Sequence, residues 1–211
     1  MYTRENVQKR NYQREMEEIL RDLGQRGEVP GLLLHSCCAP CSSYVLEALA
    51  EHFFIVDYFY NPNISPEEEY DRRARELERL VEEMPHANPV RFVEGRYEPE
   101  RYDLAVKGLE GEPEGGERCT VCFELRLREA AEKAKTFGCT FFTTTLTISP
   151  HKDAVRINAI GERIAAETGL RFLPSDFKKK DGFKRSTELS QEYGLYRQDS
   201  CGCVYAQRRP R

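Results

Sequence analysis

Residues 31–41 read GLLLHSCCAPC and carry the clearest fold signal in the chain. The first six residues are a short, mostly apolar run, which is typical of a strand buried on both faces of a parallel sheet. A turn follows over residues 37–41, and residues 42–51 have the pattern of a helix. A strand, a turn and a helix in this order predict the first half of a βαβ unit.

The same alternation continues to residue 173. Further strands are predicted at residues 53–60, 90–93, 139–145 and 171–173. Helices are predicted at residues 65–84, 122–137, 149–168 and 186–193. Ser65-Pro66-Glu67-Glu68 has the pattern of a capping box, Ser149-Pro150 that of a helix start, and the glycine-rich residues 108–117 that of a mobile loop. The alternation predicts an α/β fold, with a mostly parallel sheet and flanking helices.

Length and composition indicate one compact domain with an appendage. The chain has 211 residues, 39% of them hydrophobic, which is enough for a core without disulfide staples. A helix predicted at residues 4–23 makes residues 1–28 a helical extension. Residues 29–211 are expected to form a single α/β catalytic domain with an irregular, basic, cysteine-containing C-terminal segment. No secretory signal or membrane-spanning run is visible, so we expect a cytoplasmic protein with no membrane partner.

Positive charge is concentrated locally, although the net charge of 32 − 36 = −4 excludes a polycationic chain. Five of the ten residues from Asp176 to Arg185 are basic, and three arginines lie near the C-terminus. The five are Lys178, Lys179, Lys180, Lys184 and Arg185. A basic face on an acidic protein favours a polyanionic partner such as nucleic acid, but a solvated loop has the same composition.

Eight cysteines give the strongest chemical signal. Seven of them lie in three clusters, Cys37-Cys38-Ala-Pro-Cys41, Cys119-Thr-Val-Cys122 and Cys201-Gly-Cys203. In a reducing compartment such spacing indicates metal or redox chemistry more often than a disulfide scaffold. The first cluster follows a strand of a parallel sheet, where ligands bind, and precedes a helix N-terminus, which lowers thiol pKa. Cys139 begins an apolar strand and is expected to be a buried core thiol.

The first two clusters together can hold a tetrahedral zinc or a [4Fe–4S] cluster. Iron–sulfur is favoured because the adjacent side chains of Cys37 and Cys38 are expected to diverge too far for one zinc ion. Zinc and metal-free thiol chemistry remain open. Cys201 and Cys203 could form a strained, readily reduced disulfide, or could be further ligands or inert thiols.

Six strings taken together resemble the epoxyqueuosine reductases of the QueH family. They are residues 32–41, FYNPNI at 59–64, R-C-x-x-C-x-x-x-R-L at 118–127, TTTL-x-ISP at 143–150, FLPSDFK at 172–178 and LYRQ-x-x-CGC at 195–203. The resemblance covers roughly residues 30–206. It implies a Rossmann-like fold of the HUP, or adenine nucleotide alpha hydrolase-like, group. It also implies reduction of epoxyqueuosine to queuosine at the wobble position of tRNA, the last step of queuosine biosynthesis.

The resemblance further implies site residues and partners. Cys37, Cys38, Cys119 and Cys122 correspond to ligands of a [4Fe–4S] cluster, and Cys201–Cys203 to a redox-active disulfide. Cys41 is a candidate ligand for a second iron ion. The implied substrates are tRNAs with GUN anticodons (those for Asp, Asn, His and Tyr), and an electron donor that the sequence does not identify is required.

Proteins bind single-stranded RNA by stacking on its bases and by placing cations on its phosphates. Tyr60 and Tyr196 are candidates for base contacts, and packing is the alternative for each. Arg197 and the basic residues between 178 and 185 are candidates for phosphate contacts.

Two other functions fit parts of the sequence. An ATP-using or sulfur-transfer enzyme of the same fold group would need a glycine-rich phosphate loop after the first strand, where this chain has Cys-Cys-Ala-Pro-Cys. A zinc-stabilised RNA-binding module without catalysis would use the same thiolates, and metal analysis would distinguish it from a reductase.

Overall fold

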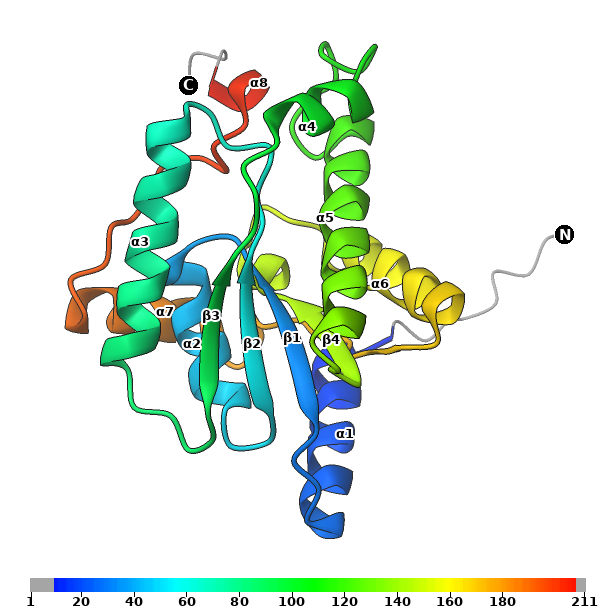
Figure 1. Ribbon diagram of the computed structural model, residues 1–211, viewed down its shortest axis with the longest axis vertical. Coiled ribbons are helices and arrows are strands. Elements are labelled where there is room, and N and C mark those ends of the chain that lie inside the picture. The colour runs from blue at the N-terminus through cyan, green and yellow to red at the C-terminus, as the bar shows by residue number, and fades with distance from the viewer. Residues whose placement is uncertain (1–9, 208–211) are drawn as a thin grey trace, which may run out of the picture.

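Five parallel strands form the central sheet, in the order β3-β2-β1-β4-β5 (Figure 1). The computed structural model describes residues 10–207. The strands are β1 (Gly31–Ser36), β2 (Phe54–Phe59), β3 (Val90–Glu94), β4 (Phe141–Thr144) and β5 (Arg171–Phe172). The chain moves outward from β1 in one direction to β3 and in the other direction to β5. The switch point, where ligands bind in such sheets, therefore lies at the carboxyl ends of β1 and β4.

Helices cover both faces of the sheet (Figure 1). One face carries α1 (Tyr12–Arg26), α2 (Ala39–Leu49) and α3 (Glu67–Glu83), with α7 (Gly182–Glu192) packed on α2. The other face carries α5 (Glu117–Thr136) and α6 (Ala154–Thr168). Three short helices complete the described chain: α4 (Pro99–Ala105), the 3₁₀ turn η1 (Thr145–Ile148) and α8 (Val204–Gln207). The Rossmann-like α/β fold predicted from the sequence is confirmed.

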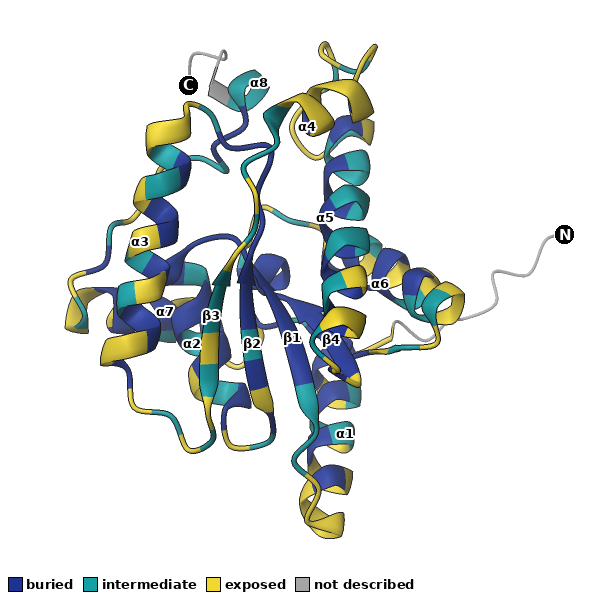
Figure 2. Cartoon of the chain, viewed as in Figure 1, coloured by how far each residue is buried: buried dark blue, intermediate teal, exposed yellow. Residues whose placement is uncertain are grey.

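The core has two halves, one on each face of the sheet. Leu32 and Leu34 of β1 pack toward α1, α2 and α3, whereas Leu33 packs toward α5 and α6. All three are fully buried, as are most strand residues in the centre of the sheet (Figure 2). Continuous burial explains why Leu32, Leu33 and Leu34 follow one another in β1 without alternating polar residues.

The N-terminal helix packs on the same core as the sheet. Met16, Leu20 and Leu23 of α1 are buried against it. The helix begins at Tyr12, capped by Asn11, and extends to Arg26. The predicted helix start at residue 4 lies outside the described residues.

Five predicted helix starts are wrong. α2 begins at Ala39, three residues before the predicted start, and α7 begins at Gly182, four residues before it. α5 begins at Glu117, five residues early, so Cys119 and Cys122 both lie in its first two turns. α6 begins at Ala154 because Asp153 caps it by accepting hydrogen bonds from the amides of Val155 and Arg156, and Ser149 does not cap it. At α3 the cap position is Pro66 and no side chain caps the helix, so the predicted capping box does not form.

Two helices were not predicted, and one predicted loop is present. α4 and α8 have only seven and four residues, too few to show a helical period. The segment 106–116 is irregular, which agrees with the loop predicted at residues 108–117 except that Glu117 begins α5. No helix among residues 10–207 combines the length and the apolar character that a membrane crossing requires.

Candidate redox and metal site

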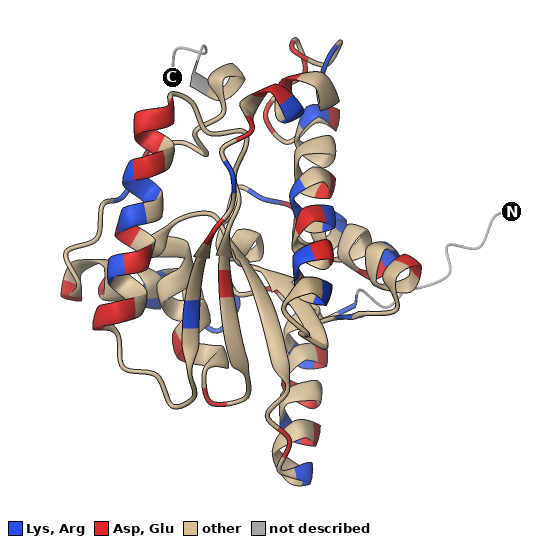
Figure 3. Ribbon diagram, in the orientation of Figure 1, with Lys and Arg blue, Asp and Glu red and all other residues tan. Residues whose placement is uncertain are grey.

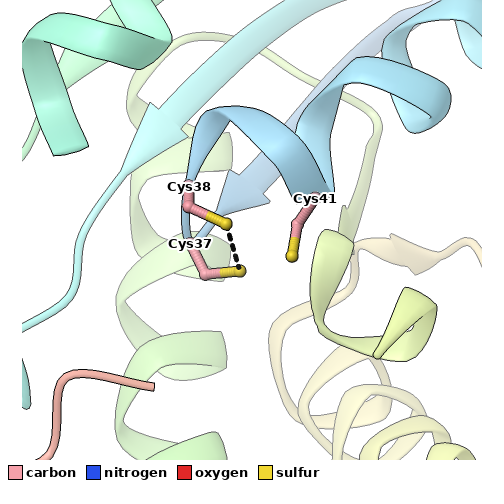
Figure 4. Close-up of side chains that lie close together, drawn as sticks. All are labelled: Cys37, Cys38 and Cys41. Atoms are coloured by element: carbon pink, nitrogen blue, oxygen red, sulfur yellow. Dashed lines mark hydrogen bonds between the residues drawn. The ribbon is translucent and has the colours of Figure 1, made fainter. Parts of the chain in front are cut away.

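The first cysteine cluster lies at the carboxyl end of β1. Cys37 and Cys38 form the turn after the strand, and Cys41 lies in the first turn of α2. The three sulfur atoms lie within 4.8 Å of one another and point toward a common centre (Figure 4). The Sγ atoms of Cys37 and Cys38 are only 3.8 Å apart. The expectation that these adjacent side chains diverge is therefore wrong, and the geometry suits a shared metal ion as well as a cluster.

The three sulfurs do not carry equal charge. The thiols of Cys38 and Cys41 hydrogen-bond to Cys37 and lower the pKa of Cys37 well below its usual value, and Lys152 and Arg126 act in the same direction. The same hydrogen bonds, with burial, raise the pKa of Cys38 to about 12 and also raise that of Cys41. Cys37 is thus the sulfur of the group that ionises most readily, and the thiolate is the form in which cysteine binds metal.

Buried threonine and histidine side chains form hydrogen bonds at and next to this turn. The Thr145 hydroxyl lies 3.3 Å from the Cys37 amide and 3.5 Å from its sulfur. His35 is fully buried, with Nδ1 2.8 Å from Thr144 Oγ1 and Nε2 3.2 Å from Arg126 Nε. Burial and the Arg126 charge lower the pKa of His35 to about 3, so this histidine is neutral and serves as a structural acceptor.

The second cluster faces the first across Arg126. Cys119 is partly exposed, and its sulfur accepts a hydrogen bond from the Gly115 amide at 3.2 Å. Cys122 is buried, and burial raises its pKa although Arg126, 4.0 Å from its sulfur, opposes this. Arg126 also donates to Asn61, which in turn donates to the Ser36 carbonyl. One buried cation therefore connects the ends of β1 and β2 to the second cluster.

The third cluster is held by the loop that follows β2. Asn63 donates to the Cys201 carbonyl at 3.1 Å, the Ser65 amide donates to the Gly202 carbonyl, and Ile64 pairs with Cys203 in an antiparallel bridge. Gly202 has φ 86°, and a Cβ atom there would meet the Ile64 side chain at 2.9 Å. Only glycine fits this left-handed turn, which explains the Cys-Gly-Cys spacing.

The two sulfurs of the third cluster have different surroundings. Cys203 is buried, and its sulfur lies 3.1 Å from the Tyr102 hydroxyl. Hydrogen bonds from Cys201 and Tyr102 lower the pKa of Cys203 to about 5. The pKa of Cys201 is raised, first because its thiol hydrogen-bonds to Cys203 and then because of burial. All eight cysteines are free thiols in this structure, so the Cys201–Cys203 disulfide stays a prediction.

The three clusters border two cavities that share part of their lining. One cavity, of about 340 Å³, is lined by Cys37, Cys38, Cys41 and Cys201. The other, of about 50 Å³, is lined by Cys119, Cys122, Cys201 and Cys203. Arg126, Lys152 and Cys201 line both. Segments more than 60 residues apart in the sequence thus bring seven sulfurs to one edge of the sheet, whereas Cys139 is a buried thiol elsewhere in the core, as predicted.

The predicted RNA-contact residues fall into different environments. Tyr60 is fully buried and stacks on Tyr58, so it offers no surface to a base. Tyr196 is partly exposed, but its hydroxyl donates to Glu69 and its ring carries the Arg72 guanidinium.

The predicted phosphate-contact residues also differ. Three of them form ion pairs: Lys178 with Asp176, Lys180 with Glu17, and Arg185 with Glu47. Lys179 and Lys184 are exposed and form no ion pair with a described residue. Arg197 is exposed and lines the larger cavity.

Several residues of the site were not given a role from the sequence, among them Arg126, Lys152, Tyr102 and Phe183. Arg126 belongs to one of the family strings, but its place between two cysteine clusters depends on tertiary structure. Lys152 is half-buried. Burial lowers its pKa, yet the sulfurs of Cys37, Cys41 and Cys201 outweigh that effect and raise it overall. The cavity edge therefore holds a protonated amine.

Comparison with known proteins identifies close relatives. Residues 32–209 match the family described as epoxyqueuosine reductase QueH. A protein named epoxyqueuosine reductase QueH from Streptococcus pyogenes is 46% identical over 201 residues, which cover 94% of this chain and 79% of that protein. The Staphylococcus epidermidis protein of the same name is 44% identical, over 94% of this chain and 85% of its own length. The one from Thermotoga maritima is 34% identical over 83% of this chain and 89% of its own.

Proposed function

The chain belongs to the epoxyqueuosine reductase QueH family and is an oxidoreductase of queuosine biosynthesis, and we propose that its three cysteine clusters act as one redox site. In this proposal Cys37, Cys38, Cys119 and Cys122 hold a [4Fe–4S] cluster. Cys201 and Cys203 alternate between a dithiol and a disulfide. The observation that supports it most strongly is that all three clusters line two cavities sharing Arg126, Lys152 and Cys201.

The donor set fits such a centre. Thiolate sulfur is the ligand that iron–sulfur clusters and zinc prefer, and the guanidinium of Arg126 and the ammonium of Lys152 offset the negative charge of several thiolates. Cys41 lies within 4.8 Å of its two neighbours and is available to a second iron ion. When bound, an iron–sulfur centre supplies electrons singly and iron can act as a Lewis acid.

The protein's own residues balance the reaction. Removing the epoxide oxygen as water, with formation of an alkene, consumes two electrons and two protons. Converting the Cys201 thiol and the Cys203 thiolate into a disulfide releases two electrons and one proton, and the Lys152 ammonium supplies the second proton, which solvent then restores. Lys152, protonated at the edge of both cavities, is placed to donate a hydrogen bond to the epoxide oxygen. An external donor must then reduce the disulfide again.

The substrate in this proposal is a tRNA with a GUN anticodon, of the Asp, Asn, His or Tyr type. The two charge signs are interspersed along α3 and α5, so neither helix is a uniformly basic surface (Figure 3). Positive charge at the cavity comes instead from Arg126, Lys152 and Arg197. Arg73 also lines the cavity but pairs with Glu69, and Glu114 and Asp199 contribute negative charge to the lining. The exposed residues Lys179 and Lys184 add positive charge around the start of α7. A small number of phosphate contacts on an acidic protein predicts binding that weakens as salt rises.

Substitution of Cys201 tests the redox role. We expect Cys201→Ser to abolish multiple turnover on epoxyqueuosine-containing tRNA, because one sulfur cannot form the disulfide, and to keep the absorbance of the iron–sulfur centre. The measurement is turnover together with the visible spectrum of anaerobically purified protein. Cys139→Ala is the matched control, since it removes a cysteine outside the three clusters and should keep both activity and absorbance.

Two results would contradict this assignment. Loss of the absorbance in Cys201→Ser would make Cys201 a ligand of the metal centre. Full turnover in Cys201→Ser would remove the dithiol from the mechanism. A zinc-containing, colourless wild-type protein would instead favour the zinc alternative for the metal.

A further inference from the structure

Phe183 is an exposed aromatic residue at the edge of the redox cavity. The large apolar side chains exposed among residues 10–207 are Phe54, Leu104, Val155 and Phe183, and of these only Phe183 lines the larger cavity, beside Cys37, Cys41 and Cys201. Phe183 is 40% exposed. An apolar ring left in water beside reactive sulfurs has a surface free to contact a ligand.

The backbone turn at residues 180–182 fixes the position of Phe183 at the start of α7. Lys180 and Asp181 have φ angles of 50° and 61°, so two consecutive residues with side chains adopt the left-handed conformation that disfavours them. Gly182 follows, and a Cβ atom there would clash with the Phe177 carbonyl oxygen and the Tyr44 ring. This unfavourable turn sets the start of α7 and places Phe183 in its first turn. Such backbone strain concentrates at functional positions.

Basic side chains without an ion-pair partner among the described residues lie next to Phe183 in the sequence. Lys184 follows Phe183 directly, Lys179 lies in the preceding turn, and neither pairs with an acidic residue of the described chain. The Arg197 guanidinium carbon lies 6.0 Å from the Phe183 ring centroid and also lines the cavity. Proteins that bind single-stranded nucleic acid combine an aromatic face for the base with nearby cations for the phosphates.

We propose that Phe183 is a stacking platform for a nucleobase of a single-stranded RNA loop, with Lys184 and Lys179 on the adjacent phosphates. The platform holds the loop at the cavity mouth while the modified base reaches the sulfurs. This inference rests on the proposed function, because it takes the substrate to be an RNA loop. It assigns base contact to a residue on α7, whereas Tyr60 has no exposed surface for it.

Binding of a labelled RNA stem-loop with a GUN anticodon tests the proposal. Fluorescence anisotropy at several salt concentrations gives the dissociation constant and its salt dependence. Phe183→Ala should weaken binding at least about fivefold while leaving the salt slope unchanged, because stacking releases no counterions. Phe183→Trp should retain wild-type affinity. Lys184→Ala should lower the salt slope by about 0.7 to 0.9, the value for one phosphate contact.

Phe54→Ala is the matched control, because Phe54 is also an exposed phenylalanine, 48% exposed, but begins β2 at the opposite end of the sheet from the cysteines. It should bind as the wild type does. The inference is overturned if Phe183→Ala binds as tightly as the wild type, or if Phe54→Ala loses as much affinity. Failure of the wild type itself to bind the stem-loop would instead overturn the proposed tRNA substrate, so the two failures are distinguishable.

Discussion

The Tyr102 hydroxyl adds to the asymmetry between the sulfurs of Cys201 and Cys203, because it lowers the pKa of Cys203 further after the larger effect of the Cys201 thiol. It lies 3.1 Å from Cys203 Sγ, inside a small buried cluster that also contains Cys122. Because Cys203 is the sulfur whose pKa is lowered, the tyrosine is the donor and Cys203 the acceptor. This leaves Cys201, which lines both cavities, as the thiol that faces a substrate. Tyr102 is a positioning residue, since it acts through Cys203.

Tyr102→Phe should make the Cys201–Cys203 pair more reducing. The variant loses a hydrogen bond to a thiolate, worth about 1–2 kcal/mol, and so destabilises the reduced form. For a two-electron couple this lowers the reduction potential by about 20–40 mV. Equilibration in glutathione buffers, followed by alkylation and mass spectrometry of the tryptic peptide 198–208, measures the potential, because that peptide contains these two cysteines and no others.

Tyr70→Phe is the control for this measurement. Tyr70 is also buried, and its hydroxyl donates to the Gly95 carbonyl at 2.7 Å, so the variant loses a hydrogen bond that does not involve sulfur. Its potential should equal that of the wild type. An unchanged potential in Tyr102→Phe, or an equal shift in both variants, would refute the role of the Tyr102 hydroxyl. The sequence offers no signal for this contact, because the two partners are 101 residues apart.

Residues 106–116 form an irregular segment that is anchored from the following helix. The Arg118 side chain, 2% exposed, donates from Nη1 to the carbonyls of Leu109, Glu110 and Glu112. The same segment supplies the Gly115 amide to Cys119 and the Glu114 side chain to the cavity lining. A composition rich in glycine and glutamate predicts a loop, but only the tertiary structure shows this anchor.

Arg118→Ala should release this segment. Three carbonyls lose their donor, so we expect the free energy of unfolding to fall by about 2–4 kcal/mol and cleavage after Glu110 or Glu114 by a glutamate-specific protease to accelerate. Arg128→Ala on the same helix is the control. The Arg128 side chain is 42% exposed and forms surface ion pairs with Glu124 and Glu167. Its removal should lower the free energy of unfolding by less than about 1 kcal/mol. Equal protease resistance in both variants would contradict the anchoring role.

The elements that the sequence predicted best are those with long apolar or periodic patterns. β1 is buried on both faces, so the apolar run Leu32–Leu34 locates it in the sequence, whereas α4 is too short for a period to appear. The start of α6 was misplaced because Ser149-Pro150 is a common helix signal, yet Asp153 makes the capping hydrogen bonds. The start of α5 was misplaced because its first turns are polar and contain no periodic apolar face.

The fold brings distant segments of the chain together at the site. The sequence predicted some of these contacts but not others. Parallel strands end at one edge of the sheet, so a site after β1 could be predicted from the pattern alone. The position of Cys201 and Cys203 could not, because the residues that follow α7 have no regular pattern and reach the site through long-range contacts such as the bridge between Ile64 and Cys203. Only the resemblance to a family indicated, before the structure, that Cys201 and Cys203 belong to the same site as the other cysteines.

Iron and acid-labile sulfide analysis of anaerobically purified protein tests whether the first two clusters hold one centre. We expect about four iron and four sulfide ions per chain in the wild type, with one further iron if Cys41 binds a second ion. Cys38→Ser and Cys119→Ser, which alter opposite sides of the Arg126 bridge, should both lose the centre, and Cys139→Ala should retain it. Wild-type protein that contains zinc without sulfide, or a Cys119→Ser variant with its full iron and sulfide content, would contradict the account.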